Sequence, residues 1–305
     1  MNVADTRSIL TGNAVAIPTT IWRAAGELDL DANIANAEFI FENGMTAAVY
    51  AGGVGEHDRL SVDQHKELLA AVAPAIRAKD GNACIGTGLG RTLERVKELV
   101  PTLSELGISY AMMMPPDTDD EDEQFSYYSE VMGILTQNGI GPVLYPRPEH
   151  PMKAGLLERL LDVCEVPGVK LANNGLLLAY AELVSRLGHE RTAWLCGTAG
   201  WWMPAYWSVG AARGMSTGIG NAFPDVPRNL LNQLVDGSFT TDDTYWTMVR
   251  IEQIRLREKS YVALVIKYLQ ELAGLKGGMN GDGSELPADV KSEIEGLVRG
   301  VGWIS

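Results

Sequence analysis

The chain has 305 residues, of which 46% are hydrophobic and 21% charged, and its formal net charge is −14. Such a composition is ordinary for a globular protein with a large core, and the negative charge argues against binding nucleic acid or an anionic membrane through a basic face. A local pocket can still be basic and accept an anionic small molecule.

Three cysteines lie far apart and form no CxxC motif, so we expect free thiols and neither a disulfide nor a zinc site. The N-terminal residues contain no apolar signal segment, and no apolar run approaches the length of a membrane span. These features predict a cytoplasmic protein that does not enter a membrane.

Short apolar stretches alternate with longer amphipathic stretches along most of the chain. Strands are expected at 14–20, 45–50, 83–88, 109–114, 142–145, around Lys170, at 193–197 and at 215–219, and helices at 31–43, 61–79, 92–106, 123–138, 153–163, 176–187, 204–213 and 227–235. A long helical stretch at 242–273, a glycine-rich break and a helix at 287–299 follow. Ser61 is the expected N-cap of the second helix, and Gly44 ends the first.

Eight successive strand–helix units predict an α/β protein with a (β/α)8 TIM barrel over residues 1–230 and a C-terminal helical extension over 231–305. A doubly wound sheet is the alternative. It rarely needs eight such evenly spaced units, and no GxGxxG motif follows the first strand.

Lys170 lies in the short apolar run GVKL, which is preceded by Pro167 and reads as a buried strand. An ammonium group is costly to remove from water unless it is paired, so Lys170 is either salt-bridged or a neutral amine able to attack a carbonyl group. Its strand contains no acidic residue, and in a barrel of this kind the carboxyl ends of the strands carry the active site. The chemical interpretation is therefore favoured.

The other candidate residues lie in predicted strands or directly after them, at the end of the barrel where the active site is expected. They are Thr19, Gly53, Val54, Tyr145, Arg147, Ser216 and Thr217. Lys170 and Tyr145 belong to consecutive strands, which suits imine chemistry: the amine adds to a ketone and the phenol carries protons.

The loop AGGVGE has two interpretations. Its backbone N–H groups can hold an anion such as a carboxylate, or its glycines simply make a tight turn. Glu56 and His57 follow, and we expect charged residues at this place to cap the next helix or bridge subunits rather than to act as acid or base.

Four motifs in order, AGGVGEHDRLS, PPD, LYPRP and GVKLANN, resemble those of the dihydrodipicolinate synthase/N-acetylneuraminate lyase family. The AGG-x-GE loop is most similar to the sugar-acid branch typified by 5-dehydro-4-deoxyglucarate dehydratase. The resemblance implies that Lys170 forms a Schiff base with pyruvate or another 2-keto acid, that Tyr145 relays protons, and that Gly53 and Val54 hold the substrate carboxylate. It also implies a homotetramer that needs no metal or organic cofactor.

Several positions depart from that family's pattern. Gly53 and Val54 replace a Thr-Thr pair of the synthase, Asp117 replaces its interface tyrosine, and the arginine that binds its aldehyde falls near His150. Because Val54 cannot pass a proton, a water, Ser216 or Thr217 is expected to substitute. We therefore expect a Schiff-base-forming lyase, a sugar-acid dehydratase or aldolase. The alternatives are dihydrodipicolinate synthase itself and a non-catalytic barrel that binds a keto acid.

Overall fold

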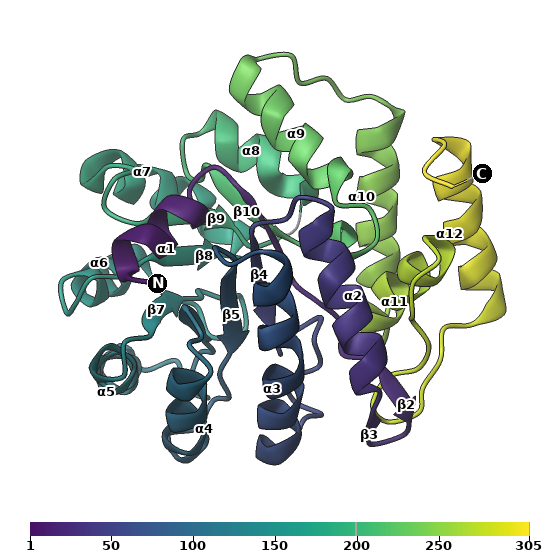
Figure 1. Cartoon of the computed structure of the whole chain (residues 1–305). Helices are drawn as coiled ribbons and strands as arrows, with labels where there is room; N and C mark the ends of the chain where they lie inside the picture. Colours follow the sequence, from purple (N-terminus) through teal and green to yellow (C-terminus); the bar gives the residue numbers. More distant parts are fainter. Residues whose placement is uncertain (199, 305) are drawn as a thin grey trace. The chain divides into compact units, whose positions relative to one another are not determined.

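The computed structural model describes residues 1–198 and 200–304. Figure 1 shows them coloured along the sequence, from purple at the N-terminus to yellow at the C-terminus. They form two compact units. The first contains Met1–Val15, Thr46–Val49 and Cys84–Ser216, and the second contains Ala16–Met45, Tyr50–Ala83 and the chain from Thr217 onward.

Eight strands form a closed barrel in the order β1-β10-β9-β8-β7-β6-β5-β4. They are β1 (Ala14–Ala16), β4 (Ala47–Tyr50), β5 (Cys84–Gly88), β6 (Tyr110–Met113), β7 (Gly141–Leu144), β8 (Gly168–Leu171), β9 (Ala193–Cys196) and β10 (Gly214–Thr217). Every strand residue is buried, as expected for parallel strands covered on both faces. The predicted (β/α)8 barrel is confirmed.

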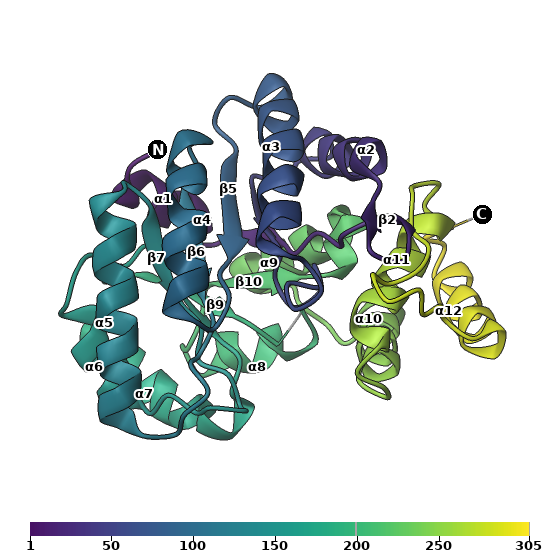
Figure 2. The same cartoon turned by 90° about the horizontal axis from the view of Figure 1, so that it is seen from below.

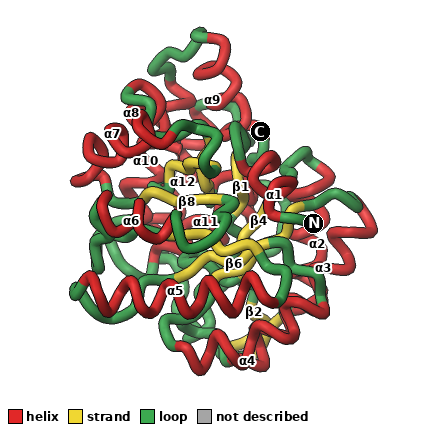
Figure 3. The backbone as a smooth tube through the Cα atoms, turned by 90° about the vertical axis from the view of Figure 1, so that its left-hand side faces the viewer, coloured by secondary structure: helices red, strands yellow, loops and turns green. Residues whose placement is uncertain are grey.

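The helices of the first unit surround its strands, which are yellow in Figure 3. They are α1 (Val3–Leu10), α4 (Leu93–Glu105), α5 (Glu121–Gln137), α6 (Ala154–Leu161), α7 (Leu177–Leu187) and α8 (Met203–Ser208), with short 3-10 turns at Asn174–Leu176 and Gly200–Trp202. Helix α1 was not predicted. Its Leu10 is fully buried and packs close to Gly168 and Gly214, the first residues of β8 and β10, so it covers the amino-terminal end of these strands.

The second unit contains α2 (Leu30–Glu42), α3 (Val62–Lys79), α9 (Asp225–Asp236), α10 (Asp243–Arg255), α11 (Tyr261–Leu272) and α12 (Ala288–Gly300). It also has a 3-10 turn at Ile219–Asn221 and an unpredicted antiparallel hairpin of β2 (Trp22–Ala24) and β3 (Glu27–Leu28). Helices α10, α11 and α12 pack against one another (Figure 2). This three-helix group is the C-terminal extension expected from the sequence, although the boundary at residue 230 falls inside α9 and stays a prediction.

The helical stretch expected over 242–273 consists of two helices, because the chain turns between α10 and α11. Arg255 Nε donates to the carbonyl oxygen of Val262 at 3.1 Å, and the Arg255 guanidinium forms a buried ion pair with Glu252. Side-chain bonding across the turn therefore stabilises the break. The cap at Ser61 was predicted correctly: Ser61 and Gln64 form a reciprocal capping box at the start of α3.

Candidate active site

The register of β7 and β8 places Tyr145 beside Lys170. Val143 pairs with Gly168 and Leu144 with Val169, so the next position along both strands is Tyr145 opposite Lys170. The Lys170 ammonium nitrogen lies 4.2 Å from the centroid of the Tyr145 ring. Both side chains are buried, at 6% and 9% exposure. An amine and a phenol in contact, shielded from solvent, are the groups that imine formation requires.

The positive charge around Tyr145 changes its acidity. Burial raises the pKa of the phenol, but the charges of Lys170 and Arg147, together with a hydrogen bond from Lys170, outweigh burial and lower the pKa below its ordinary value of 10.0. A phenol with a lowered pKa gives up its proton more readily near neutral pH. Tyr145 is thus suited to exchange protons with the amine and with a substrate oxygen.

Arg147 is positioned by a carboxylate. Its Nε and Nη2 atoms donate to the two oxygens of Glu149 at 3.0 and 2.5 Å, and its guanidinium carbon lies 5.3 Å from the centre of the Tyr145 ring. Burial raises the pKa of Glu149, but the hydrogen bonds and charge of Arg147 outweigh it and lower the pKa. The pair is bidentate and planar, which fixes the guanidinium in one orientation.

Two of the positions that depart from the family pattern contact each other. His150 Nε2 lies 3.1 Å from Asp117 Oδ1, and His150 Nδ1 lies 3.1 Å from Asp119 Oδ1. The imidazole is 19% exposed, while the two carboxylates are largely exposed. His150 is therefore in contact with two acidic side chains.

A polar group beyond the ends of β8 and β9 was missed by the sequence reasoning. Asn174 Oδ1 accepts hydrogen bonds from Tyr206 at 3.0 Å and from Thr198 at 3.2 Å. Thr198 Oγ1 also lies 3.6 Å from the Cys196 sulfur. Burial raises the pKa of Cys196 to about 11, even though Thr198 and the charge of Lys170 lower it. A raised pKa disfavours the thiolate, which is the form of cysteine that acts as a nucleophile.

Gly197 explains how Lys170 fits. A Cβ atom at Gly197 would lie 2.8 Å from both Lys170 Cγ and the carbonyl oxygen of Leu171. Only glycine leaves room here for the Lys170 side chain, so the glycine directly after β9 is the residue that this packing requires. Ser216 lies in β10 of the same unit and is buried, with 4% of its surface exposed.

The AGGVGE loop belongs to the second unit and has an unusual backbone. Ala51 and Glu56 have positive φ angles of 48° and 55°, which residues other than glycine rarely adopt. Thr20 Oγ1 donates to the carbonyl oxygen of Gly55 at 2.7 Å. Within the described residues, the backbone N–H groups of Gly53 and Val54 donate to no protein acceptor. Such free donors suit an anion.

The remaining candidates of this unit already have partners. Thr19 Oγ1 donates to Gln270 Oε1 in α11 at 2.6 Å, and Thr217 Oγ1 accepts from the Gly220 N–H at 3.2 Å. Both threonines are buried. The expectation that Glu56 caps the next helix was wrong, because Ser61 caps α3 and Glu56 pairs with Lys267 of α11 instead.

A model of the dihydrodipicolinate synthetase family matches residues 10–280. The chain belongs to this family. A probable 5-dehydro-4-deoxyglucarate dehydratase from Bacillus licheniformis is 26% identical over 265 residues, 86% of this chain and 84% of that protein.

Solved structures agree on the fold. A dihydrodipicolinate synthase from Bacillus clausii superposes with a TM-score of 0.85 at 23% identity, covering 97% of this chain and 99% of the other. An N-acetylneuraminate lyase from Proteus mirabilis gives a TM-score of 0.83 at 16% identity, covering 97% and 99%. Members of the family, including the dehydratase and this lyase, are lyases that use a Schiff-base mechanism.

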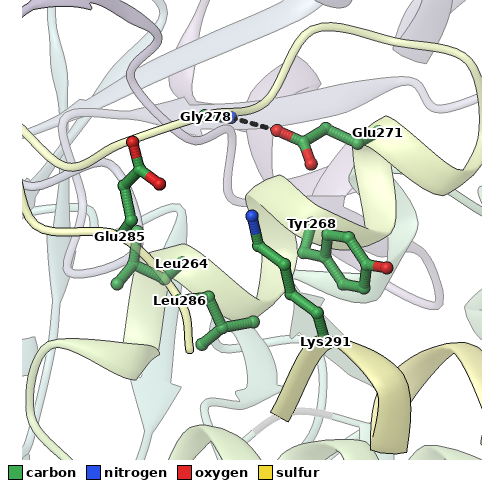
Figure 4. Close-up of a pocket in the computed structure, with 7 residues that line it drawn as sticks. All are labelled: Leu264, Tyr268, Glu271, Gly278, Glu285, Leu286 and Lys291. Carbon is green, nitrogen blue, oxygen red and sulfur yellow. Dashed lines mark hydrogen bonds between the residues drawn. The ribbon is translucent and has the colours of Figure 1, made fainter. Parts of the chain in front are cut away.

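A separate cavity of about 120 Å³ lies in the second unit (Figure 4). It is lined by Leu264, Tyr268, Glu271, Gly278, Glu285, Leu286 and Lys291, and Glu271 accepts a hydrogen bond from the Gly278 N–H at 2.7 Å. None of the predicted site residues lines it. Among residues 1–198 and 200–304, no group of His, Cys, Asp or Glu side chains could hold a metal ion, and no helix is long and apolar enough to cross a bilayer.

Proposed function

We propose that this chain is a Schiff-base-forming lyase that acts on a 2-keto-3-deoxy sugar acid, with 5-dehydro-4-deoxyglucarate as the first candidate substrate. The observation that carries the proposal is the buried contact of 4.2 Å between the Lys170 amine and the Tyr145 ring at the carboxyl ends of adjacent barrel strands. The similarity to the dehydratase supports the choice of substrate.

In the proposed reaction, the neutral Lys170 amine attacks the keto carbon, and Tyr145 donates a proton to the oxygen that becomes the carbinolamine hydroxyl. Loss of this hydroxyl as water gives the imine. The imine nitrogen then accepts an electron pair when the adjacent carbon loses its proton, which gives an enamine. The enamine expels the hydroxyl group on the next carbon as water. An aldol cleavage starts instead from the imine, before the adjacent carbon loses a proton. Deprotonation of the hydroxyl on the next carbon then breaks the carbon–carbon bond, whose electron pair passes to the imine nitrogen, so that an aldehyde is released and the enamine forms.

The substrate carboxylate next to the keto group is proposed to bind the N–H groups of Gly53 and Val54. These donors follow β4, and Lys170 is near the end of β8. Parallel barrel strands present their carboxyl ends on one face, where such barrels bind substrates. Since Val54 has no hydroxyl, Ser216, Thr217 or a water completes the proton relay in this proposal.

The second carboxylate of a sugar diacid is proposed to bind Arg147. Glu149 fixes the orientation of the guanidinium through Nε and Nη2, and the positive charge beside the Tyr145 ring suits a contact with a second carboxylate. Thr19 is proposed to contribute to substrate binding indirectly, because the adjacent Thr20 bonds to Gly55 of the AGGVGE loop. Dihydrodipicolinate synthase activity is the second candidate, in line with the fold. Against it, the resemblance puts the synthase's arginine near His150, which contacts acidic side chains, although Arg147 lies close in sequence.

Reduction with borohydride in the presence of pyruvate tests the mechanism. We expect an adduct on the peptide that contains Lys170 and none in a Lys170→Met chain. Absence of the adduct in the unchanged protein overturns the imine mechanism. A panel of 2-keto-3-deoxy sugar acids, assayed separately for water loss and pyruvate release, then distinguishes dehydration from aldol cleavage, and an adduct without turnover of any of them supports the non-catalytic binder.

We further propose that the protein works in the cytoplasm as a homotetramer. Light scattering coupled to size-exclusion chromatography measures the molar mass directly. A monomer at micromolar concentration contradicts the tetramer without affecting the imine mechanism.

A further inference from the structure

Glu56 lies at the end of the AGGVGE loop and is buried in the second unit, with 4% of its side chain exposed. Its Oε2 atom accepts from Lys267 Nζ at 2.5 Å and from Trp22 Nε1 at 3.0 Å. Its Oε1 atom accepts from the Gly281 N–H at 3.0 Å, and Arg59 Nε lies 3.6 Å away. Both oxygens of this buried carboxylate are therefore bonded to donors.

Lys267 approaches Glu56 from α11 and is fully buried. Besides Glu56, its ammonium group donates to the carbonyl oxygen of Met279 at 2.6 Å and lies 3.5 Å from Asn280 Oδ1. Burial lowers the pKa of Lys267, while the charge and hydrogen bond of Glu56 act in the opposite direction. One side chain thus joins α11, the 279–281 segment and the loop.

A second buried polar residue of α11 reaches the neighbouring loop. Gln270 is 1% exposed and accepts the hydrogen bond from Thr19, while the adjacent Thr20 donates to Gly55. Residues 267 and 270 are three positions apart and share one face of the helix. That face of α11 therefore contacts the 18–20 segment and the AGGVGE loop together.

The loop needs such support because its backbone is not one that the residues prefer. Glu56 itself has a positive φ, as does Ala51 at the start of the loop. A non-glycine residue persists in this conformation only where surrounding contacts enforce it. The contacts of the Glu56 carboxylate provide that enforcement at one end of the loop.

We propose that Glu56 and Lys267 are positioning residues whose buried ion pair holds the Gly53 and Val54 N–H groups in the orientation that binds the substrate carboxylate. The inference rests on the proposed function, and it makes helix α11 a part of the substrate-binding machinery. Neither residue touches the substrate. Their loss is expected to weaken carboxylate binding more than it slows the chemistry at Lys170.

The test uses the full chain and pyruvate as the probe. Borohydride trapping at a series of pyruvate concentrations gives the half-saturating concentration, and steady-state rates give KM and kcat. In Glu56→Gln and Lys267→Met we expect the half-saturating pyruvate concentration and KM to rise by about 10- to 100-fold. Losses of this size are typical when a residue that orients a ligand-binding group is removed. The adduct at saturating pyruvate should still form on Lys170.

Glu252→Gln is the matched control. Glu252 is equally buried, with 4% of its side chain exposed, and pairs with Arg255 within the same group of C-terminal helices. Like Glu56→Gln, this change should lower the melting temperature. The half-saturating pyruvate concentration should stay within about twofold of that of the unchanged chain, because a loss of stability at a site that does not contact the loop leaves the loop in place.

The double variant Glu56→Leu/Lys267→Met separates positioning from stability. Replacing both members of a buried ion pair by apolar residues often restores stability, so the melting temperature should recover relative to the single variants. Half-saturation should stay high, because leucine cannot accept the bonds from Trp22 and Gly281. Recovery of both properties together overturns the positioning role.

Unchanged half-saturation in Glu56→Gln, with an adduct still forming, also overturns the inference. If Lys267→Met is recovered only unfolded, Glu56→Gln and the double variant still decide the question. The amide oxygen of Glu56→Gln can still accept a hydrogen bond from the buried Lys267 ammonium, and the double variant removes both buried charges. Absence of trapping in the unchanged chain is a different result. It refutes the proposed function and not the role of the pair alone.

Discussion

The amine of Lys170 faces the ring of Tyr145 at 4.2 Å, and the register of the neighbouring strands places the two residues opposite each other. Their contact follows from the pairing of β7 with β8 and not from a flexible loop. Parallel strands run about 4.8 Å apart, so a lysine and an aromatic residue at equivalent positions must touch. The barrel itself therefore fixes the positions of the two residues that we propose as nucleophile and proton carrier.

Replacement of Tyr145 by phenylalanine removes the phenol and keeps the ring. We expect kcat to fall by about 10²- to 10⁴-fold, the usual contribution of a positioned acid or base. Tyr180→Phe is the control, because Tyr180 is a buried phenol of the same unit that donates to the carbonyl oxygen of Met152. Steady-state turnover of the sugar acid measures both variants, and equal losses would count against a role for Tyr145 in proton transfer.

The pH dependence of the reaction should respond to the charges around Tyr145. Arg147 lowers the pKa of the phenol and Glu149 raises it. Arg147→Gln should therefore move the ionisation of Tyr145 to higher pH, and Glu149→Gln should move it to lower pH. The alkaline limb of the kcat/KM profile reports both shifts. Shifts in the same direction for the two variants would contradict the assignment.

The same lowered pKa has a defined effect on stability. A phenol whose pKa is lower in the folded state favours folding fully only above its unfolded pKa of about 10. This contribution is lost as the pH falls through the folded pKa. Denaturant unfolding measures the free energy of unfolding of the unchanged chain and of Tyr145→Phe. The difference between the two free energies should widen toward alkaline pH and be smallest near neutral pH.

Val54→Thr restores a hydroxyl that the synthase has at this place. If the relay is incomplete, turnover should rise, and a Ser216→Ala change should cost less activity in the Val54→Thr background than in the unchanged chain. This non-additivity is the expected sign of two groups that serve one proton path. Unaffected turnover at every pH in Val54→Thr would count against a relay at that position.

Gly197→Ala tests the packing around the nucleophile. The new methyl group meets Lys170 Cγ and a backbone oxygen at 2.8 Å, and the backbone cannot yield. We expect a loss of about 100-fold in turnover, since a displacement of about 1 Å near the reacting atoms has that effect. Gly133→Ala in α5 meets no atom within 4 Å and should stabilise the protein by about 0.5 to 1 kcal/mol without changing turnover. Thermal unfolding and steady-state rates measure both.

The barrel could be predicted because each strand is buried on both faces and therefore reads as a short apolar run between amphipathic helices. Lys170 and Tyr145 could be predicted because a charged and a polar residue interrupt or end such runs. The β2–β3 hairpin and helix α1 were missed because they are short. The turn after Arg255 was missed because side-chain bonds to Glu252 and Val262 create it, and periodicity does not record them.

The partners of the site residues were the least predictable part. Glu56 and Lys267 lie 211 positions apart, and Thr19 and Gln270 lie 251 apart. No local pattern links them. The unusual feature that the sequence did contain was a lysine and a glutamine among the apolar residues of α11, at spacing that places them on one buried face.

The separation of Glu56 and Lys267 along the sequence also determines the order in which they appear during synthesis of the chain. Ribosomes add about 5 to 20 residues each second, so the 211 residues between the two take about 10 to 40 s. During that interval the Glu56 carboxylate has left the ribosome without its ammonium partner. Lysine 170 and its barrel strands are made well before α11. The strand that carries the proposed nucleophile is therefore made early. If Lys267 orients the loop as we propose, the Gly53 and Val54 N–H groups become able to bind a substrate carboxylate only after α11 has emerged.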